Sequence, residues 1–111
     1  MTRYLVIYEA PLSAQQQFAD ATPEQTQAGM DARIAWAEKA GDAVVDLGVP
    51  LGPGRLITKD GLGEYQGQAT GYSVLEAVSL DDATGLLREH PHLHTPNGSI
   101  TVLEGMPIPG M

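Results

Sequence analysis

Three histidines stand at alternate positions near the end of the sequence, and they are all the histidines in the chain: His90, His92 and His94. Alternate side chains of an extended segment point to one side, so imidazoles at this spacing are able to meet on a metal ion. Three ligands from five adjacent residues would make a cramped site, however, and no distant carboxylate is marked out to complete it. We therefore predict no metal site and expect either exposed histidines or acid–base chemistry.

Acid–base catalysis is the chemistry that suits His90 best, because imidazole titrates closest to neutral pH. A catalytic histidine of this kind needs an orienting carboxylate, and the two predicted helices offer four candidates. They are Asp31, Asp46, Asp81 and Asp82. Helix capping is the simpler role for the last two, and a solvated helix face for the first two. The sequence does not determine which carboxylate reaches the histidine.

Two tyrosines are candidates for the wall of a pocket beside these residues. Tyr8 ends the first predicted strand, and Tyr65 lies in a glycine-rich segment. The alternative for Tyr8 is a place in the core or in an interface, and the alternative for Tyr65 is a loop side chain. His92 completes the set of pocket residues that we predict.

Composition and missing motifs exclude several classes of function. The 111 residues include no cysteine, which rules out disulfides, thiolate nucleophiles and iron–sulfur clusters. Fourteen acidic against six basic residues give a formal charge of −8, which argues against nucleic acid and anionic membrane as partners. No apolar run approaches the roughly 20 residues of a membrane helix, and no signal peptide pattern is present. Nucleotide-binding and P-loop motifs are absent, so we predict no cofactor and a single cytoplasmic domain, 1–111.

Capping residues and hydrophobic patterning predict two helices. Thr22-Pro23-Glu24-Gln25 is a typical helix start, with a capping threonine, a proline in the first turn and a glutamine to close a capping box. This helix is expected to run to about Leu47, with a break near Gly41. The second helix is capped by Ser79 and ends at His90-Pro91, because the residue before proline avoids helical geometry.

The remaining pattern predicts four strands, at 3–8, 55–58, 72–78 and 99–104. Residues 9–21 are expected to form a solvated loop with at most one helical turn, 59–71 a mobile hairpin connection, and 105–111 an extended tail. The order β-α-β-β-α-β predicts a ferredoxin-like α+β fold, with both helices on one face of a four-stranded antiparallel sheet. The first strand is apolar at consecutive positions, so the opposite face of the sheet also carries apolar side chains. Such a patch is typical of an interface, and we predict a homodimer that packs sheet against sheet.

The order and spacing of several segments resemble the YCII-related family, which includes the DGPF-type proteins. The most specific segment is Gly71-Tyr72-Ser73-Val74-Leu75-Glu76-Ala77. The other matching segments are 4–8, 22–24, 49–53, 79–83, 90–93 and 98–102. The resemblance implies a ferredoxin-like domain of the dimeric α+β barrel type that dimerises through its sheet. It does not imply a particular reaction.

The sequence departs from this family at the residues on which the family's enzymatic reputation rests. Those residues are a histidine in the first helix and an aspartate before the proline that ends the second. Here His90 precedes Pro91, and the position in the first helix falls near Asp31. Either the pair is exchanged, or no pair survives. The DGPF motif is also missing, since Asp60-Gly61 is followed by Leu62-Gly63.

Two functional hypotheses follow from the residues and the resemblance. The first is an acid–base enzyme for a small organic molecule, with His90 as the base, Asp31 as its orienting residue, and Tyr8, Tyr65 and His92 around the pocket. The second is a non-catalytic binding or regulatory module, which by analogy with family members would be associated with a sigma factor.

Overall fold

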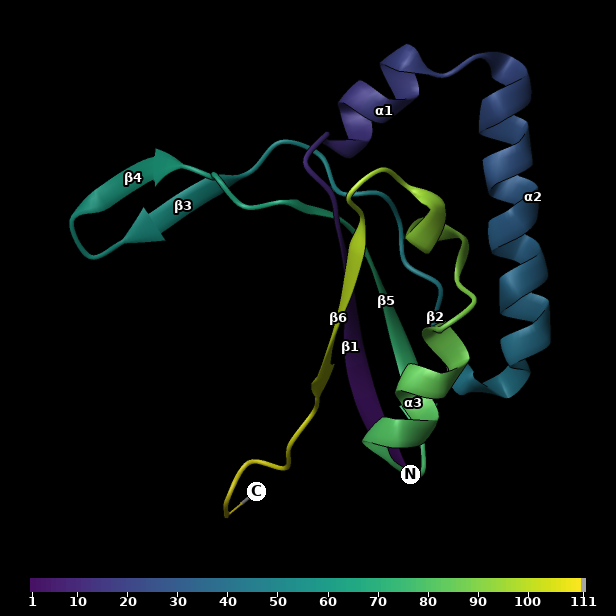
Figure 1. Cartoon of the computed structure of the whole chain (residues 1–111). Helices are drawn as coiled ribbons and strands as arrows, with labels where there is room; N and C mark the ends of the chain where they lie inside the picture. Colours follow the sequence, from purple (N-terminus) through teal and green to yellow (C-terminus); the bar gives the residue numbers. More distant parts are fainter. Residues whose placement is uncertain (111) are drawn as a thin grey trace.

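The centre of the fold is a four-stranded antiparallel sheet with the strand order β2-β5-β1-β6, as the computed structural model of residues 1–110 shows (Figure 1). The inner strand β1 (Thr2–Glu9) pairs with β5 (Ala69–Ala77) on one side and with β6 (Ser99–Glu104) on the other. The short edge strand β2 (Val44–Asp46) pairs with β5. The predicted α+β fold is confirmed.

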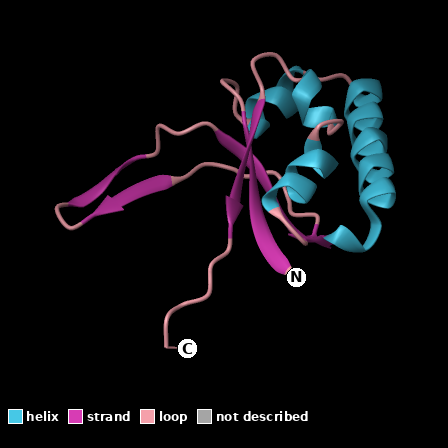
Figure 2. Cartoon of the chain, turned by 60° about the horizontal axis from the view of Figure 1, so that its bottom comes forward, coloured by secondary structure: helices cyan, strands magenta, loops and turns pink. Residues whose placement is uncertain are grey.

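Two helices lie on one face of this sheet (Figure 2). Helix α2 (Pro23–Ala40) begins with the predicted capping box, in which Thr22 and Gln25 each accept the other's backbone N–H on a side-chain oxygen. Helix α3 (Leu80–Leu87) begins after Ser79, whose hydroxyl accepts a hydrogen bond from the backbone N–H of Asp82. Both predicted helix starts are confirmed. At each one, a side-chain oxygen accepts a hydrogen bond from a backbone N–H that the end of the helix would otherwise leave free.

Helix α2 ends at Ala40, where the predicted break near Gly41 falls, but it does not resume toward Leu47 as expected. Gly41 adopts a φ of +62°, a conformation that favours glycine and stops the helix. A short 3₁₀ turn, η1 (Gly41–Ala43), leads into β2, where β-branched valines suit an extended backbone. The second strand of the main sheet is therefore 44–46, and its predicted assignment to 55–58 is wrong.

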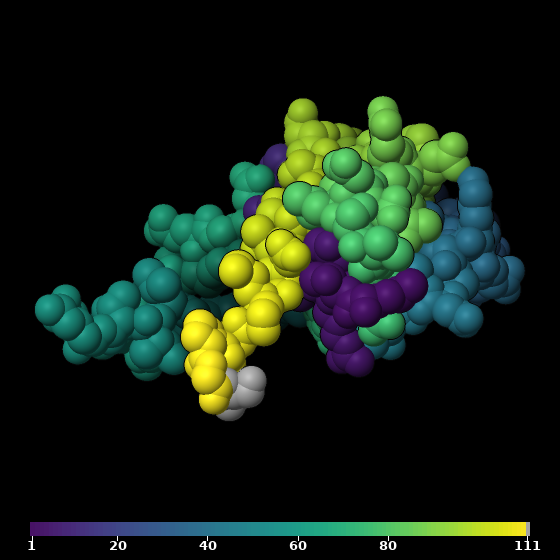
Figure 3. Space-filling view, turned by 90° about the horizontal axis from the view of Figure 1, so that it is seen from below, coloured from purple at the N-terminus to yellow at the C-terminus, as the bar shows by residue number. Residues whose placement is uncertain are grey.

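Residues 55–58 do form a strand, but it belongs to a separate hairpin. Strand β3 (Arg55–Thr58) pairs only with β4 (Gly61–Glu64), and this two-stranded sheet is inserted between β2 and β5. The segment 59–71, predicted as a hairpin connection, contains β4 and the start of β5, so the hairpin closes within it and not with 72–78. The hairpin projects away from the helices and the main sheet, on the opposite side of the molecule (Figures 1 and 3).

The polar segment 9–21 contains a longer helix than the single turn that was expected at most within a loop. Helix α1 (Ala14–Asp20) starts after Ser13, whose hydroxyl accepts a hydrogen bond from the backbone N–H of Gln16. Glutamine and alanine favour helices, which explains the outcome despite the lack of apolar periodicity. The prediction failed because this helix buries only Ala14 and so carries almost no amphipathic pattern.

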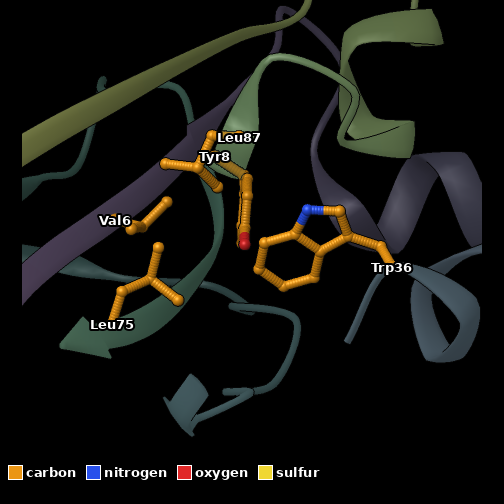
Figure 4. Packing of buried hydrophobic residues seen from close by; sticks show 5 residues of the cluster. All are labelled: Val6, Tyr8, Trp36, Leu75 and Leu87. Atoms are coloured by element: carbon orange, nitrogen blue, oxygen red, sulfur yellow. The ribbon is translucent and has the colours of Figure 1, made fainter. Parts of the chain in front are cut away.

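The hydrophobic core lies between the helices and the covered face of the sheet. Its main cluster consists of Val6, Tyr8, Trp36, Leu75 and Leu87, and Tyr8 and Trp36 point toward one another from β1 and α2 (Figure 4). Tryptophan and tyrosine contribute large buried areas, so this pair fixes the distance between α2 and the end of β1.

The other face of the sheet carries an apolar row, as predicted. Leu5 pairs with Val74 on one neighbouring strand and with Leu103 on the other, and both leucines are exposed, at 43% and 51%. Within residues 1–110, no helix has the length and hydropathy needed to cross a membrane. The predicted tail runs outside helices and strands from 105 to 110, and Met111 lies outside the described residues.

Candidate functional site

A cavity of about 160 Å³ lies at the end of β1, between the sheet, α1, α2 and the 3₁₀ turn η2 (Pro91–His94). Its lining residues are Tyr8, Ala14, Gln17, Phe18, Arg33, Pro50, Thr70, Gly71, His90 and His92. None of these is a carboxylate, although the chain has fourteen acidic residues. The cavity therefore brings histidines and an arginine together without an acidic neighbour in its wall.

His90 is buried at the point where the chain leaves α3, with 3% of its surface exposed. Its ring stacks on Tyr8 at a centroid distance of 4.6 Å and meets the ring of Trp36 edge-on at 4.5 Å. The backbone N–H of His92 donates a hydrogen bond to Nδ1 of His90, at 3.0 Å. Because a backbone N–H can only donate, Nδ1 carries no proton, and the proton of the neutral ring resides on Nε2.

The Nε2 atom of His90 is buried and has no hydrogen-bond partner among residues 1–110. Burial lowers the pKa of this imidazole to about 4, with further contributions from the positive charge of Arg33 and from His92. The ring is therefore uncharged at neutral pH. It presents an N–H donor, and its one unprotonated nitrogen already accepts a hydrogen bond.

His92 has the complementary arrangement. Its Nε2 lies 2.8 Å from the backbone carbonyl oxygen of Glu9. A carbonyl oxygen can only accept, so this nitrogen is the donor and carries the proton. In the uncharged form of the ring, Nδ1 is then the unprotonated nitrogen. The ring centroid lies 5.4 Å from that of Tyr8, and the side chain is partly exposed.

Arg33 brings a positive charge to the cavity from α2. Its Nη2 donates a hydrogen bond to the carbonyl oxygen of Leu47 at 2.6 Å, and its guanidinium carbon lies 5.7 Å from the centre of the Tyr8 ring, within range of a cation–π contact. The salt bridges among residues 1–110 are Arg3–Glu76 and Lys39–Glu89. Within that part of the chain, Arg33 has no carboxylate partner.

Tyr8 supports the site through its hydroxyl group. Ser73 donates to the carbonyl oxygen of Leu47 at 2.6 Å, so the Tyr8 hydroxyl, 2.8 Å from Ser73 Oγ, is the donor in that second bond. Burial raises the pKa of the Tyr8 phenol, which keeps it protonated. Tyr8 thus holds neighbouring groups in place, and its proton is already committed to a hydrogen bond.

The structure brings together three of the five predicted site residues: Tyr8, His90 and His92. Asp31 is exposed and accepts a hydrogen bond from Gln27. It lies two positions before Arg33, and residues two apart on a helix do not share a face. The predicted contact between Asp31 and His90 is therefore not formed, and the His90 ring is oriented by a donor, the backbone N–H of His92, in place of an acceptor.

Tyr65 and His94 lie in other parts of the fold. The Tyr65 hydroxyl accepts a hydrogen bond from the backbone N–H of Ala69, and its side chain lines a second cavity beside the hairpin. His94 lines a third cavity, between α2 and α3. No group of three potential metal ligands occurs within residues 1–110. The turn η2 places His94 away from His90 and His92, because a 3₁₀ backbone does not alternate its side chains as a strand does.

Three residues of the site were not predicted from the sequence: Arg33, Trp36 and Ser73. Arg33 and Trp36 are three positions apart on α2 and therefore share one helix face. Trp36 lies 6% exposed, and its indole N–H donates to the carbonyl oxygen of Leu86 at 2.8 Å. The three-residue spacing of Arg33 and Trp36 was the sequence signal that could have placed both at the site. Ser73 is fully buried within β5, and its position is set by strand register alone.

Comparisons with known proteins support the fold. No protein-family model matches the chain, and no curated protein matches it in sequence. One similar solved structure is 5-chloro-2-hydroxyhydroquinone dehydrochlorinase (TftG) from Burkholderia phenoliruptrix AC1100, in complex with 2,5-dihydroxybenzoquinone. The similarity covers 92% of this chain and 90% of that one, with a TM-score of 0.54 and 16% identity. The likeness supports the α+β fold, with its four-stranded antiparallel sheet and helices.

Proposed function

We propose that this chain binds a small organic molecule in the cavity beside Tyr8 and carries out acid–base chemistry on it with its own side chains. The observation that carries this proposal is the pair of fixed tautomers, in which His90 presents an N–H donor and His92 retains an unprotonated nitrogen. The structural likeness to a dehydrochlorinase supports a small ring compound as the ligand.

His92 is the general base in this proposal, and His90 is a hydrogen-bond donor. The sequence had favoured His90 as the base, but its Nδ1 accepts a backbone N–H, and a pKa of about 4 makes the ring a weak base. Nδ1 of His92 takes the proton from the ligand. Negative charge that develops on a ligand oxygen is stabilised by Arg33 and by the Nε2–H of His90.

The size of the cavity restricts the ligand. At about 160 Å³ it is smaller than the roughly 300–1,000 Å³ of pockets that hold drug-sized molecules. A single six-membered ring with polar substituents suits this volume. The rings of Tyr8 and Phe18 and the methyl of Ala14 supply apolar contacts for its faces.

We also propose that the chain is a YCII-like domain that forms a homodimer through the open face of its sheet. The row of Val74, Leu5 and Leu103 supports this interface, because contiguous exposed apolar surface is typical of contacts between proteins. The hairpin projects on the side of the sheet away from the helices (Figure 1), and it contains two highly exposed apolar residues, Ile57 and Leu62, each 75% exposed. An isolated two-stranded hairpin is marginally stable, so a second copy would also stabilise it. Sedimentation that shows a monomer at micromolar concentration would contradict this proposal.

The test of the enzymatic proposal is proton exchange at carbon, which is the simplest acid–base reaction that the site could catalyse. In D₂O, a ring carbon of 2,5-dihydroxybenzoquinone takes up a deuteron and then loses its original proton to a base, and loss of the C–H NMR signal gives the rate of this exchange. We expect the wild-type chain to accelerate this exchange. We expect His92→Gln to remove the acceleration while the compound still binds. His94→Gln is the matched control and should behave as the wild type, because His94 lines another cavity.

The same experiment separates the enzyme from a binding module. A wild-type chain that binds the compound at His90 and His92 without accelerating exchange would support a non-catalytic ligand-binding protein. A chain that neither binds the compound nor accelerates exchange would contradict the proposed ligand class. An equal loss of acceleration in His92→Gln and His94→Gln would contradict the assignment of the base.

A further inference from the structure

We infer that the cavity selects a ligand with one negatively charged, planar oxygen group, such as a carboxylate or an enolate, and that Arg33 is the residue that determines this specificity. This inference rests on the proposed function and specifies the charge of its ligand. It follows from the distribution of charge around the cavity, from the hydrogen bonds of Arg33 and from the unpartnered nitrogen of His90.

The charge around the cavity is opposite in sign to that of the chain. The whole sequence has a formal charge of −8, yet the cavity wall contains Arg33 and no aspartate or glutamate. Burial and the nearby guanidinium hold the pKa of His90 at about 4, so this ring adds no positive charge at neutral pH. Arg33 is thus the one permanent charge in the wall, and it favours an anion while it disfavours a cation.

Arg33 is held in place without being neutralised. One N–H group donates to the carbonyl oxygen of Leu47 at 2.6 Å, and Ser73 donates to the same oxygen. A guanidinium has five N–H donors, so most of them are not used by this bond. The side chain is partly buried beside the Tyr8 ring, where an unpaired charge is costly unless a ligand of opposite charge accompanies it. A planar oxygen pair is the group that matches the guanidinium fork.

His90 provides an independent observation that points to the same ligand. It lines the same cavity, and only 3% of its surface is exposed. Its Nε2 is the one buried side-chain polar atom without a hydrogen-bond partner in the described part of the chain. Buried donors are nearly always satisfied in folded proteins, so an exception requires an explanation. A ligand oxygen supplies the missing acceptor. A positively charged ligand group has no lone pair and would leave the donor unsatisfied.

A charge series of one shape tests this inference: benzoate, benzamide and benzamidine. The three compounds share a ring and a planar substituent and differ in charge, from negative through neutral to positive. Binding is followed by NMR through the ring signals of His90 and His92, with His94 as an internal reference. We expect benzoate to shift the first two signals, benzamide to bind at least about tenfold more weakly, and benzamidine to leave them unchanged.

Variants of Arg33 complete the experiment. Arg33→Gln should weaken benzoate by about tenfold or more and leave benzamide unchanged, and Arg33→Lys should restore part of the benzoate affinity. Arg3→Gln is the matched control, because Arg3 lies outside this cavity and pairs with Glu76. If Arg33→Gln does not fold, the charge series on the wild type decides alone.

The two proposals fail in different ways. Equal affinity for benzoate and benzamide, or benzoate binding that is unaffected by Arg33→Gln, would overturn the charge inference and leave the small-molecule site intact. If no member of the series shifts His90 or His92, the inference fails. If 2,5-dihydroxybenzoquinone leaves the same signals unchanged as well, the proposed small-molecule site fails with it.

Discussion

The backbone N–H of His92 donates a hydrogen bond to Nδ1 of His90 at 3.0 Å. This one contact gives two neighbouring imidazoles different chemistry. It places the proton of His90 on Nε2, and the carbonyl oxygen of Glu9 fixes the proton of His92 on the corresponding nitrogen. The ring that is buried and stacked is a donor, and the ring that is partly exposed retains a free basic nitrogen.

The stability of the fold should depend on the protonation of His90. In the unfolded chain this imidazole takes up a proton near pH 6.5, whereas burial delays uptake in the folded chain to about pH 4. Lowering the pH from 6.5 to 4 therefore favours the unfolded state, and the free energy of unfolding falls by about 3 kcal/mol across this window. Urea denaturation at a series of pH values measures this loss.

The variant His90→Gln separates this contribution from those of other groups. It should be less stable than the wild type at neutral pH, because it loses the ring stacked on Tyr8. Its stability should then fall less steeply between pH 6.5 and pH 4. Identical slopes for the two proteins would show that His90 takes up its proton normally in the folded state.

Ser73→Ala should remove about 1–3 kcal/mol of stability, because it leaves the buried Tyr8 hydroxyl without its acceptor. Thermal and urea denaturation measure the change. Ser99→Ala is the control, since Ser99 is exposed on β6 and should change stability by less than about 0.5 kcal/mol. Equal effects of the two substitutions would contradict the hydrogen-bond chain from Tyr8 to Leu47.

Gly48→Ala should destabilise the fold by about 3 kcal/mol or more. A Cβ at this position would lie 1.8 Å from the carbonyl oxygen of Tyr72, and the φ of +78° is itself unfavourable for alanine. Gly52→Ala in the same connection meets nothing within 4 Å and should be nearly neutral. Gly48 follows Leu47, whose carbonyl oxygen accepts hydrogen bonds from Arg33 and Ser73. If Gly48→Ala were tolerated, the backbone of this segment would not run beside the site as described.

The order of the main elements was predictable because their signals are local. The capping box at Thr22 and Gln25, the cap at Ser79 and the apolar run of β1 each depend on neighbouring residues. The position of β2 after the break at Gly41 was not predictable in the same way. The apolar spacing of Val44 and Val45 continues the helical pattern, and only the backbone at Gly41 breaks it.

The site was predictable only in part. His90, His92 and Tyr8 were found from residue type, and the structure brings them into one cavity. Arg33 was missed, because its role depends on the carbonyl oxygen of Leu47, fourteen positions away in the sequence. The orienting carboxylate was expected from chemistry alone. In the fold, a backbone N–H that donates to Nδ1 of His90 fixes the ring, and residue type does not reveal a contact made by a backbone group.

The most direct test of this account is the histidine ring spectrum of the wild-type chain, recorded by ¹⁵N–¹H NMR with and without 2,5-dihydroxybenzoquinone. At neutral pH we expect both His90 and His92 to carry the proton on Nε2, as their hydrogen bonds require. Addition of the compound should then shift Nδ1 of His92 and leave His94 unchanged. A proton on Nδ1 of His90, or a response at His94 alone, would contradict the assignment of the cavity and of its base.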